Sequence, residues 1–416
     1  MPCAHPSPQP SDRDKPMPSQ FNQSLVMIRA NLLSLTRRLA IAASMALSVA
    51  LVVCVLAGFL SMAAGFERAL KSAGSPTVAV ILGGGTNQEN GSDVPAGVIR
   101  TIEAMRGDIG LVRDTHGNVV LSREIVVPVE VTNGQAGVAK MLTLRGMNPT
   151  GPSLRDGVVL TEGRFSKPGA REIVVGERIA AEFTVLAIGR QVRLGSVNWT
   201  VVGHFSSGGS AFESEIWADL DAVRSAFDRP GEVQSVRVRL DGTGAIGKLM
   251  TALRGITTTP LVAAIEADLY AAEASGTANL IRMFGWPIAL LMALGATAGA
   301  LNTMMSSVSD RAVEIATLRV LGFSRPSAFI ATWAEAVTLA ALGVVFGLVA
   351  SWFVFNGWRA STIGANYSSM SFQLTMNEGV MLTAGLLGLA IGVVGGALPA
   401  FSATRLPLTA ALRARG

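Results

Sequence analysis

The most regular feature of the chain is a set of four long apolar runs without a charged residue. They cover residues 39–66, 283–309, 336–358 and 379–404. A helix needs about 20 apolar residues to cross the hydrocarbon core of a bilayer, so each run is long enough to span it. The pattern predicts an α-helical membrane protein with four transmembrane helices.

The long stretch between the first two runs has a different pattern. Short β-branched segments such as "EIVVPVEV" and "QSVRVRL" alternate with turn-rich pieces, which is typical of strands. Helical patterns fall at about 94–105, 177–183 and 245–254, and "EADLYAAEASGTANLI" reads as a helix that leads into the second run. We therefore expect a large α+β domain inserted between transmembrane helices 1 and 2.

The basic residues predict which side of the membrane each part occupies. Lys and Arg gather on the cytoplasmic side of membrane helices. The arginines next to the runs are Arg29, Arg37, Arg38, Arg311, Arg319, Arg325, Arg405, Arg413 and Arg415. Their placement predicts that both termini are cytoplasmic and that residues 67–282 lie outside, as in a multi-pass protein of the cytoplasmic (inner) membrane.

Four parts follow from these patterns. Residues 1–24 are rich in Pro and Ser and are expected to form a disordered cytoplasmic tail. Residues 25–66 form an amphipathic lead-in and the first membrane helix, which is longer than the roughly 7–15 apolar residues of a signal peptide. Residues 67–279 form the extracytoplasmic domain, and 280–416 hold the last three membrane helices.

Composition narrows the function further. The chain is 50% hydrophobic and 15% charged, far less charged than a soluble domain. Its net charge of +5 comes without a basic stripe interleaved with aromatics, so nucleic acid is not an expected partner. Cys3 and Cys54 cannot form a zinc spacing, and the three histidines are far apart, so no metal site is predicted.

No catalytic motif emerges from the sequence either. "GTGAIGKL" at 242–249 resembles a phosphate-binding loop, but Leu249 stands where a magnesium-binding Ser or Thr is needed. We interpret it as a turn that starts a helix, and we expect no bound cofactor. Glu213 and Glu215 are expected to be solvated rather than paired for acid–base work. The chain alone is not expected to be an enzyme.

Small residues are patterned inside the membrane runs. Glycines four residues apart allow helix backbones to approach closely. They are Gly295, Gly299, Gly343, Gly347, Gly388, Gly392 and Gly396. The repetition predicts a tightly packed bundle, and a dimer seam is compatible with it. Glu335, at the mouth of the third run, is expected to snorkel or to pair near the cytoplasmic face.

The segment "SSVSDRAVEIATLRVLGFSRP" at 306–326 is longer than a turn and too short for a domain. On a helix, Asp310, Glu314, Thr317 and Leu321 share one face. Val308, Ala312, Ile315 and Ala316 fall on the other side. One face is suited to packing on the bundle and the other to a cytoplasmic partner, although a solvated interfacial helix would have a similar pattern.

The last third of the chain resembles the FtsX-like permease domain of the MacB/LolC type of ABC transporters. The matching residues are Asn302, Ser307, Val308, Arg311, Glu314, Ile315, Leu318, Arg319, Leu321, Gly322, Glu335, Pro399, Ala400, Arg405, Pro407 and Arg413. Where the family usually has Gly after Glu-Ile, this chain has Ala316. The large inserted domain is similar, more loosely, to a MacB periplasmic core domain, through "EGRFSKPGAREIVVGERIAAEF" for example.

The resemblance implies a permease subunit that works as a dimer with a separate cytoplasmic ATPase, which would bind the ATP. Movements driven by ATP hydrolysis would act on a coupling helix at about 308–323, through Asp310, Arg311, Glu314, Ile315, Leu318, Arg319, Leu321 and Gly322. The outer domains would then export or extract a lipoprotein, peptide or amphiphile by mechanotransmission. A periplasmic adaptor or outer-membrane partner is compatible with this arrangement. The alternative is a signal transducer that activates a cell-wall hydrolase or senses a ligand.

Overall fold

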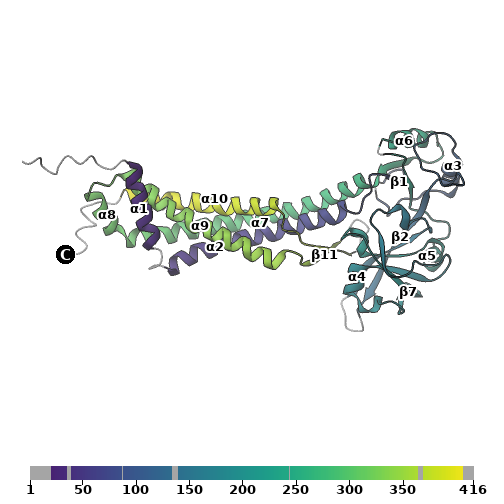
Figure 1. Ribbon diagram of the computed structural model, residues 1–416, viewed down its shortest axis with the longest axis horizontal. Helices are drawn as coiled ribbons and strands as arrows, with labels where there is room; N and C mark the ends of the chain where they lie inside the picture. The colour runs from purple at the N-terminus through teal and green to yellow at the C-terminus, as the bar shows by residue number, and fades with distance from the viewer. Residues whose placement is uncertain are drawn as a thin grey trace, which may run out of the picture. The chain divides into compact units, whose positions relative to one another are not determined.

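The computed structural model describes residues 20–34, 39–86, 88–133, 139–242, 244–363 and 369–405. The chain packs as two compact units (Figure 1). The helical unit comprises Met1–Gly58, Gly285–Val354 and Glu378–Gly416. The core unit comprises Phe59–Phe284 and Phe355–Asn377. Residues 355–377, which we expected within 280–416, thus pack with the core unit.

Four of the described helices are long and apolar enough to cross a membrane. They are α2 (Leu39–Lys71), α7 (Glu266–Asp310), α9 (Arg325–Phe355) and α10 (Glu378–Thr404). This matches the four predicted spans. The shorter helices of the helical unit are α1 (Gln20–Ser34) and α8 (Ala312–Val320). Helix α1 begins inside the range expected as a tail, and its Gln23 Oε1 accepts a hydrogen bond from the Ser324 backbone N–H at 3.1 Å.

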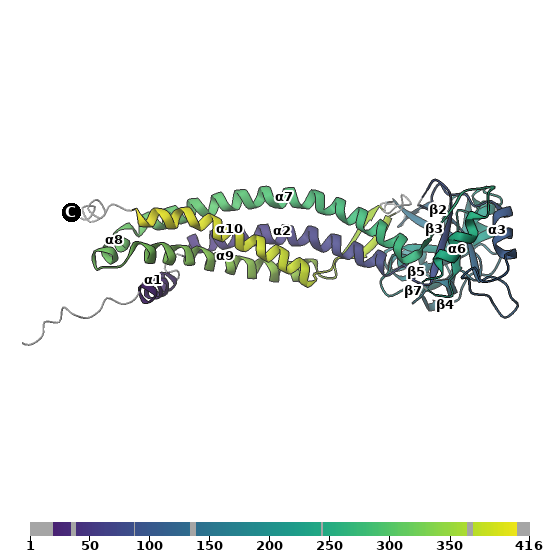
Figure 2. The same cartoon turned by 90° about the horizontal axis from the view of Figure 1, so that it is seen from above.

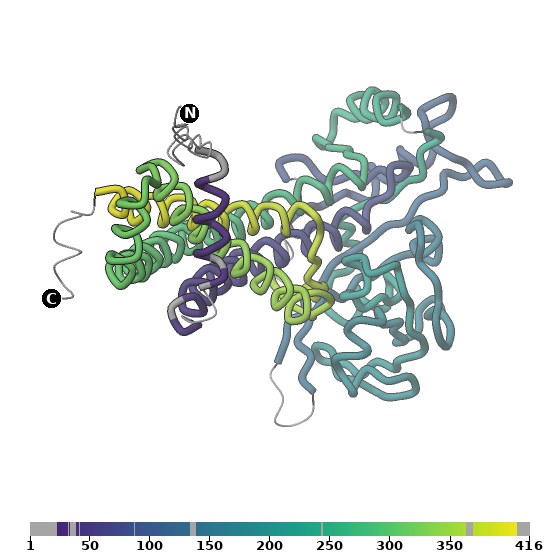
Figure 3. Tube along the Cα trace, turned by 60° about the vertical axis from the view of Figure 1, so that its left-hand side comes forward, coloured from purple at the N-terminus to yellow at the C-terminus, as the bar shows by residue number. Residues whose placement is uncertain are grey.

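Glycines bring the membrane helices into contact within the helical unit. A Cβ at Gly343 would lie 2.5 Å from the Ala46 carbonyl oxygen, so α9 meets the backbone of α2 there. A Cβ at Gly392 would lie 2.2 Å from the Ala340 Cβ, so α10 packs equally closely on α9. Distant parts of the sequence therefore lie side by side: Figure 2 separates the helices, and Figure 3 shows the purple start of the chain among the green and yellow ones.

The core unit contains a ten-stranded mixed sheet. The strand order is β10-β1-β9-β2-β3-β8-β5-β7-β4, and β6 pairs with β7. Their bounds are β1 Val78–Gly83, β2 Leu121–Thr132, β3 Ala139–Met147, β4 Val159–Gly163, β5 Glu172–Gly176, β6 Gln191–Leu194, β7 Val197–Ser206, β8 Glu215–Asp219, β9 Ser235–Arg239 and β10 Leu261–Ile265. The β3–β8 and β5–β7 pairs are parallel and the others are antiparallel.

Helices cover this sheet in two lobes. The short elements are α3 (Ala96–Ala104), η2 (Pro152–Leu154), α4 (Glu177–Glu182), η3 (Thr184–Leu186), η4 (Ala211–Ser214), α5 (Leu220–Ala226) and α6 (Ile246–Arg254). Helices α3 and α6 pack with β1, β9 and β10 around one apolar cluster. Helices α4 and α5 pack with β2, β3, β5 and β8 around another. The three predicted helices at about 94–105, 177–183 and 245–254 are confirmed.

A third apolar cluster in the core unit includes a hairpin that the sequence did not predict. Strands β11 (Arg359–Ile363) and β12 (Ser369–Gln373) form a separate two-stranded sheet between the third and fourth apolar runs. Phe372 is fully buried, and its ring meets that of Phe66 edge-on with centroids 5.5 Å apart. Gly65 permits this approach, because a Cβ there would lie 2.2 Å from the Gln373 carbonyl oxygen.

Candidate functional site

The predicted coupling helix at 308–323 is divided in the structure. Helix α7 ends at Asp310, and Arg311 leaves the helical conformation, with φ −100° and ψ 11°. Helix α8 ends where Gly322, at φ +100°, lets the backbone turn left-handed. The Gly322 N–H donates to the Arg319 carbonyl and the Phe323 N–H donates to the Leu318 carbonyl, which is the Schellman pattern of a helix end. Gly322 therefore terminates α8.

The side chains of this segment divide into an exposed face and a buried one. The exposed residues are Asp310, Glu314, Thr317, Val320, Leu321 and Gly322. Val308, Ile315 and Ala316 are buried. Val308 and Ile315 join an apolar cluster with Met27, Ala328, Ala331 and Ala403, from α1, α9 and α10. The exposed and buried side chains of this segment thus lie on the two faces that the helical period predicts.

Arg311 lies inside the helical unit rather than on the exposed face. Its Nη2 donates to Glu335 Oε2 at 2.5 Å and to Ser307 Oγ at 3.1 Å. Both members of the ion pair are buried, with side chains 4% and 3% exposed. An isolated charge would be costly there, so each residue compensates the desolvation of the other. Glu335 is therefore paired, one of the two outcomes we expected for it.

Arg319 and Leu318 anchor α8 from its other end. Leu318 is half-buried, packed on the cluster of Val308 and Ile315. Arg319 Nη1 donates to the Thr404 carbonyl at the end of α10, at 3.2 Å. Together with the Arg311–Glu335 pair, this contact connects the segment to both α9 and α10. Movement of α8 would therefore act on two membrane helices.

The glycines that we predicted to pack helices fall into two groups. Gly343, Gly347, Gly388, Gly392 and Gly396 each have another helix so close that a Cβ would lie less than 3.0 Å from it. Gly295 and Gly299 of α7 have none of the described residues within 4 Å of a Cβ position. The second pair thus lies on an open face of the helical unit.

Reasoning from sequence missed a cluster of buried charges in the core unit. We call it the arginine–glutamate network; its members are Arg145, Arg155, Arg237, Glu89, Glu124, Glu215 and Glu266. Glu124 Oε2 lies 3.1 Å from Arg145 Nη1, 2.6 Å from Arg155 Nη2 and 2.5 Å from Arg237 Nη1. Glu266, the first residue of α7, lies 2.8 Å from Arg237 Nε. The network therefore joins four strands and two loops to that helix.

The environment of the network keeps two of its carboxylates, Glu124 and Glu89, ionised. Burial by itself would raise the pKa of Glu124, but Arg155, Arg237 and Arg145 outweigh it and lower this pKa to about 2. Burial would also raise the pKa of Glu89, and Arg145 and Arg237 hold it well below its usual range. The arrangement is chemically suited to rigid positioning rather than to proton transfer.

Two of these buried carboxylates correct an expectation. We expected Glu213 and Glu215 to be solvated, yet they are 7% and 9% exposed. Glu215 receives two hydrogen bonds from Arg145, from Nε at 2.9 Å and Nη2 at 2.7 Å. Glu213 pairs with Arg178 at 3.3 Å and accepts the Ser207 N–H. Both faces of the sheet are covered here, so a charged side chain on either face is buried.

Arg178 also connects the β11–β12 hairpin to the rest of the core unit. Its Nη1 donates to the Ser371 carbonyl at 2.6 Å. Ser214 Oγ donates to the same carbonyl at 3.0 Å and lies 3.1 Å from the Ser371 backbone N–H. These polar contacts, with the buried ring of Phe372, hold the hairpin between η4 and the end of α2.

Among the described residues, no group of three or more His, Cys, Asp or Glu side chains could hold a metal ion. His204 lies 2.8 Å from the Leu186 carbonyl through Nε2, as a structural histidine would. Helix α6 includes Leu249 in its buried face, so the stretch that resembles a phosphate loop starts an ordinary helix. Arg37, Arg38, Arg413, Arg415, Pro407 and Cys3 lie outside the described residues.

Two protein-family models match the sequence. Residues 41–256 match the MacB-like periplasmic core domain, and residues 286–408 match the FtsX-like permease C-terminal domain. The chain is 24% identical over 356 residues to the macrolide export ATP-binding/permease protein MacB of Bordetella avium, covering 81% of this chain and 52% of that protein. It is 32% identical over 113 residues to the macrolide export ATP-binding/permease protein MacB of a Campylobacter jejuni strain, covering 27% of this chain and 16% of that protein.

Two solved structures align with part of the chain. The periplasmic region of MacB from Actinobacillus actinomycetemcomitans aligns with 12% identity and a TM-score of 0.35, over 48% of this chain and 92% of that one. The extracellular domain of the transporter YknZ from Gram-positive bacteria aligns with 13% identity and a TM-score of 0.34, over 45% and 98%.

The match to the periplasmic core model extends over more than half of the chain, and the permease model covers most of the C-terminal remainder. The chain spans about half the length of the Bordetella relative. It carries four helices long enough to be membrane spans and a large mixed α/β core unit. The protein therefore belongs to the family of FtsX-like permeases that carry a MacB-like periplasmic core domain.

Proposed function

We propose that this protein is the transmembrane subunit of an ABC transporter, coupled to an ATPase on a separate cytoplasmic chain. ATP hydrolysis by that partner would move the core unit, which we place outside the cytoplasmic membrane, inserted between the first two membrane helices. Both termini would be cytoplasmic, as the basic residues beside the spans predict.

The observation that carries the proposal is the two-sided character of α8. Asp310, Glu314 and Thr317 form an exposed polar face, and Leu321 adds an exposed apolar residue at its end, 72% exposed. A partner protein that covers this face would remove the exposed apolar surface of Leu321 and of the adjacent Val320 from water. We assign this face to the ATPase.

The buried side of α8 supplies the route for force. Ile315 and Val308 pack among residues of α1, α9 and α10, while Arg311 is tied to Glu335 and Arg319 to Thr404. Packed side chains are close to incompressible, so displacement of α8 shifts the helices it contacts. The residues that anchor α8 to the neighbouring helices are therefore Arg311, Ile315, Leu318 and Arg319. Gly322 ends α8 and so determines the length of this helix.

Helix α7 offers the connection to the core unit. Its first residue, Glu266, belongs to the arginine–glutamate network, and Arg311 directly follows its last residue. A rigid element with a specific anchor at either end can transmit displacement between two sites. We propose that α7 transmits displacement from the ATPase contact to the core unit.

The substrate class that we propose rests on the resemblance to a family rather than on a single cavity. The relatives are named macrolide export ATP-binding/permease proteins, which places ATP binding and permease in one polypeptide there. For this chain we propose export or extraction of a lipoprotein, peptide or amphiphile by mechanotransmission. The open face of α7 at Gly295 and Gly299 would meet a second copy in a homodimer. A periplasmic adaptor or outer-membrane partner would complete the assembly.

The test is copurification of the chain with candidate ABC ATPases, together with the rate of ATP hydrolysis by the complex. Glu314→Arg reverses a charge on the exposed face of α8 without touching a buried residue. We expect it to reduce ATPase retention about tenfold or more, as loss and reversal of a charged interface contact does. Glu162→Arg, an equally exposed reversal on β4, is the matched control and should change nothing.

Equal ATPase retention and equal ATP turnover in the native protein and in Glu314→Arg would rule out this face as the contact. Arg311→Glu is not a suitable variant for that purpose, because it would bury a second negative charge against Glu335 and unfold the site. The ATPase face is therefore tested only with residues that the chain itself leaves exposed.

A further inference from the structure

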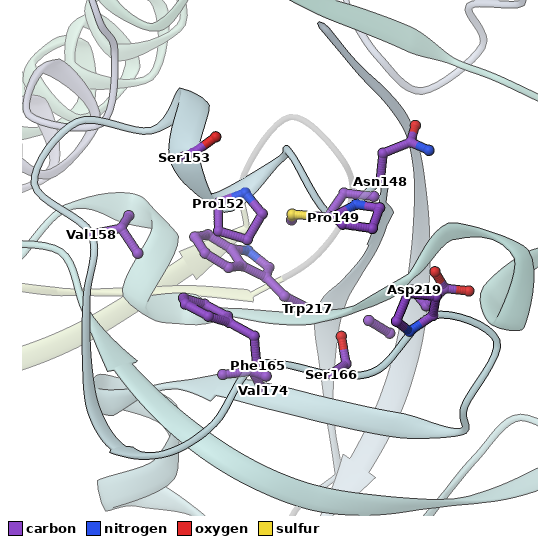
Figure 4. A pocket seen from close by; sticks show the side chains of 13 residues that line it. Asn148, Pro149, Pro152, Ser153, Val158, Phe165, Ser166, Val174, Trp217 and Asp219 are labelled. Atoms are coloured by element: carbon purple, nitrogen blue, oxygen red, sulfur yellow. The ribbon is translucent and has the colours of Figure 1, made fainter. Parts of the chain in front are cut away.

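The core unit contains a cavity of about 350 Å³ that neither the family nor the coupling proposal explains (Figure 4). Its floor is made by buried residues of β3, β5 and β8, namely Met147, Val174, Trp217 and Ala218. The walls come from the loop around η2 and from residues 165–168. The complete lining is Met147, Asn148, Pro149, Pro152, Ser153, Val158, Phe165, Ser166, Pro168, Val174, Trp217, Ala218 and Asp219.

Most of this lining is apolar and aromatic. Phe165 is 39% exposed, so an apolar group that covers it would remove apolar surface from water. The indole N–H of Trp217 donates to Glu215 Oε2 at 2.8 Å, so its polar atom is already satisfied away from the cavity. Ligand pockets are commonly of this size and are apolar with a few fixed polar groups. The cavity is therefore suited to a ring or a short alkyl group.

One acidic side chain sets the charge preference. Asp219 is the one ionisable residue in the lining and is 8% exposed. Its Oδ1 accepts the Gly169 N–H at 3.0 Å and the Ala222 N–H at 3.1 Å, which caps α5. Among the described residues, no donor contacts its Oδ2. Oδ2 is not among the fully buried atoms that lack a hydrogen-bond partner, so water reaches it, and a ligand N–H could take the place of that water.

The nearby cations do not reverse this preference. Arg155 lies over the Trp217 ring at 5.2 Å, but it is bound by Glu124 on two oxygens and is not part of the lining. Lys167 is exposed and also outside the lining. Asn148 Oδ1 accepts the Arg123 N–H at 2.9 Å and keeps a second lone pair as an acceptor. An anionic ligand would meet the Asp219 carboxylate and no cationic side chain in the lining.

We propose that this cavity binds the aryl or alkyl group of a small cationic amphiphile, with its ammonium at Asp219 Oδ2. The apolar part lies against Phe165, Val158 and the prolines, and a ring there removes exposed apolar surface from water. The ammonium gains a charge-assisted hydrogen bond to Asp219. The site goes beyond the transport proposal and does not depend on an ATPase.

The test compares three probes with one apolar body: 4-phenylbutylamine, 4-phenylbutanol and 4-phenylbutyrate. Binding to the full chain in nanodiscs of zwitterionic lipid is measured by ligand-observed NMR, and binding to empty nanodiscs is subtracted. We expect the amine to bind about tenfold more tightly than the alcohol, as one charge-assisted contact provides. The butyrate should bind more weakly than the alcohol.

Variants separate the two parts of the site. Asp219→Asn keeps an oxygen to cap α5 and should lower amine binding to the level of the alcohol. Asp221→Asn makes the same charge change on α5, outside the lining and on a side chain 82% exposed, and should leave all three affinities unchanged. Ser166→Trp should fill the cavity and abolish binding of every probe.

The proposal fails if the butyrate binds as tightly as the amine, or if amine and alcohol bind equally to the unaltered protein. It also fails if Ser166→Trp leaves amine binding intact, because the probe would then occupy another place. A loss of ATPase coupling leaves all of these results unchanged, so the two proposals fail independently.

Discussion

Glu124 in the core unit lies against three guanidinium groups, whereas Glu335 in the helical unit pairs with Arg311 alone among the described residues. Both carboxylates are buried, so both need compensation for the loss of water. They differ in redundancy. If one arginine moves away from Glu124, two remain, but if Arg311 moves away from Glu335 a bare charge is left.

This difference indicates different mechanical roles. A charge with several partners holds its elements in one arrangement, and the arginine–glutamate network thereby fixes strands of both lobes to the start of α7. A charge with one partner forms a contact that can be made or lost in a single step. The end of α7 near α8 is then the part suited to switching, and its start is suited to rigid attachment.

The largest effect should come from breaking the network at its centre. Glu124→Gln leaves three buried guanidinium groups short of a countercharge, and removal of one partner from a buried ion pair typically costs about 3–5 kcal/mol. We expect the core unit to lose that much stability, measured by thermal or denaturant unfolding of the full chain in nanodiscs.

Glu103→Gln is the control for this change. Glu103 pairs with Arg123 where both side chains are about one-third exposed, so its loss should cost less than about 1 kcal/mol. Similar costs for the two variants would show that the network is not the rigid attachment described above.

A somewhat smaller effect should follow from breaking the isolated pair. Arg311→Leu leaves Glu335 unpaired and should destabilise the helical unit by roughly 3 kcal/mol. The double variant Arg311→Leu with Glu335→Leu removes both charges, and replacing a buried pair by apolar residues is often neutral. We therefore expect the double variant to recover most of the loss in unfolding measurements.

Recovery of stability in the double variant would show that Arg311 and Glu335 form an isolated pair and not part of a network. A double variant as unstable as Arg311→Leu would mean that the pair has further partners or a packing role that leucine cannot replace. If the double variant is stable but no longer couples ATP turnover to transport, the pair acts in switching rather than in stability.

The smallest effect should be that of mild acid on the network. The folded pKa of Glu124 is lowered from 4.5 to about 2, so its stabilising contribution is complete above about pH 4.5 and is lost as pH falls towards 2. The stability difference between the native protein and Glu124→Gln should therefore be constant from pH 7 to 5. It should shrink only below about pH 4.5. A difference that already shrinks at pH 6 would contradict the pairing.

The sequence predicted the regular parts of this molecule because their signals are local. Four uncharged runs identified the candidate spans, and β-branched segments such as that of β2 identified strands. The helical period alone separates exposed Glu314 from buried Ile315. These features depend on neighbours within a few residues along the chain.

The features that were missed depend on distant neighbours. Arg237 lies between two valines in β9, where alternation suggests a solvent-facing charge, yet both faces of that strand are covered. Its partner Glu124 is in β2, far away in the sequence. The burial of Arg311 likewise depends on its pairing with Glu335 in another helix. Burial and pairing of this kind carry no local signature.

The hairpin β11–β12 has a practical consequence for cutting the chain. A fragment taken as 67–279 would lack Phe372 and Leu374, which are buried in the same cluster as Phe66 and Phe212. It would also lose the carbonyl of Ser371 that Arg178 contacts. Such a fragment would present a fresh apolar surface to water and tend to aggregate. A soluble version should instead begin near Phe59 and carry residues 355–377 joined by a linker. The β11–β12 hairpin would then still bury this apolar cluster in the isolated domain.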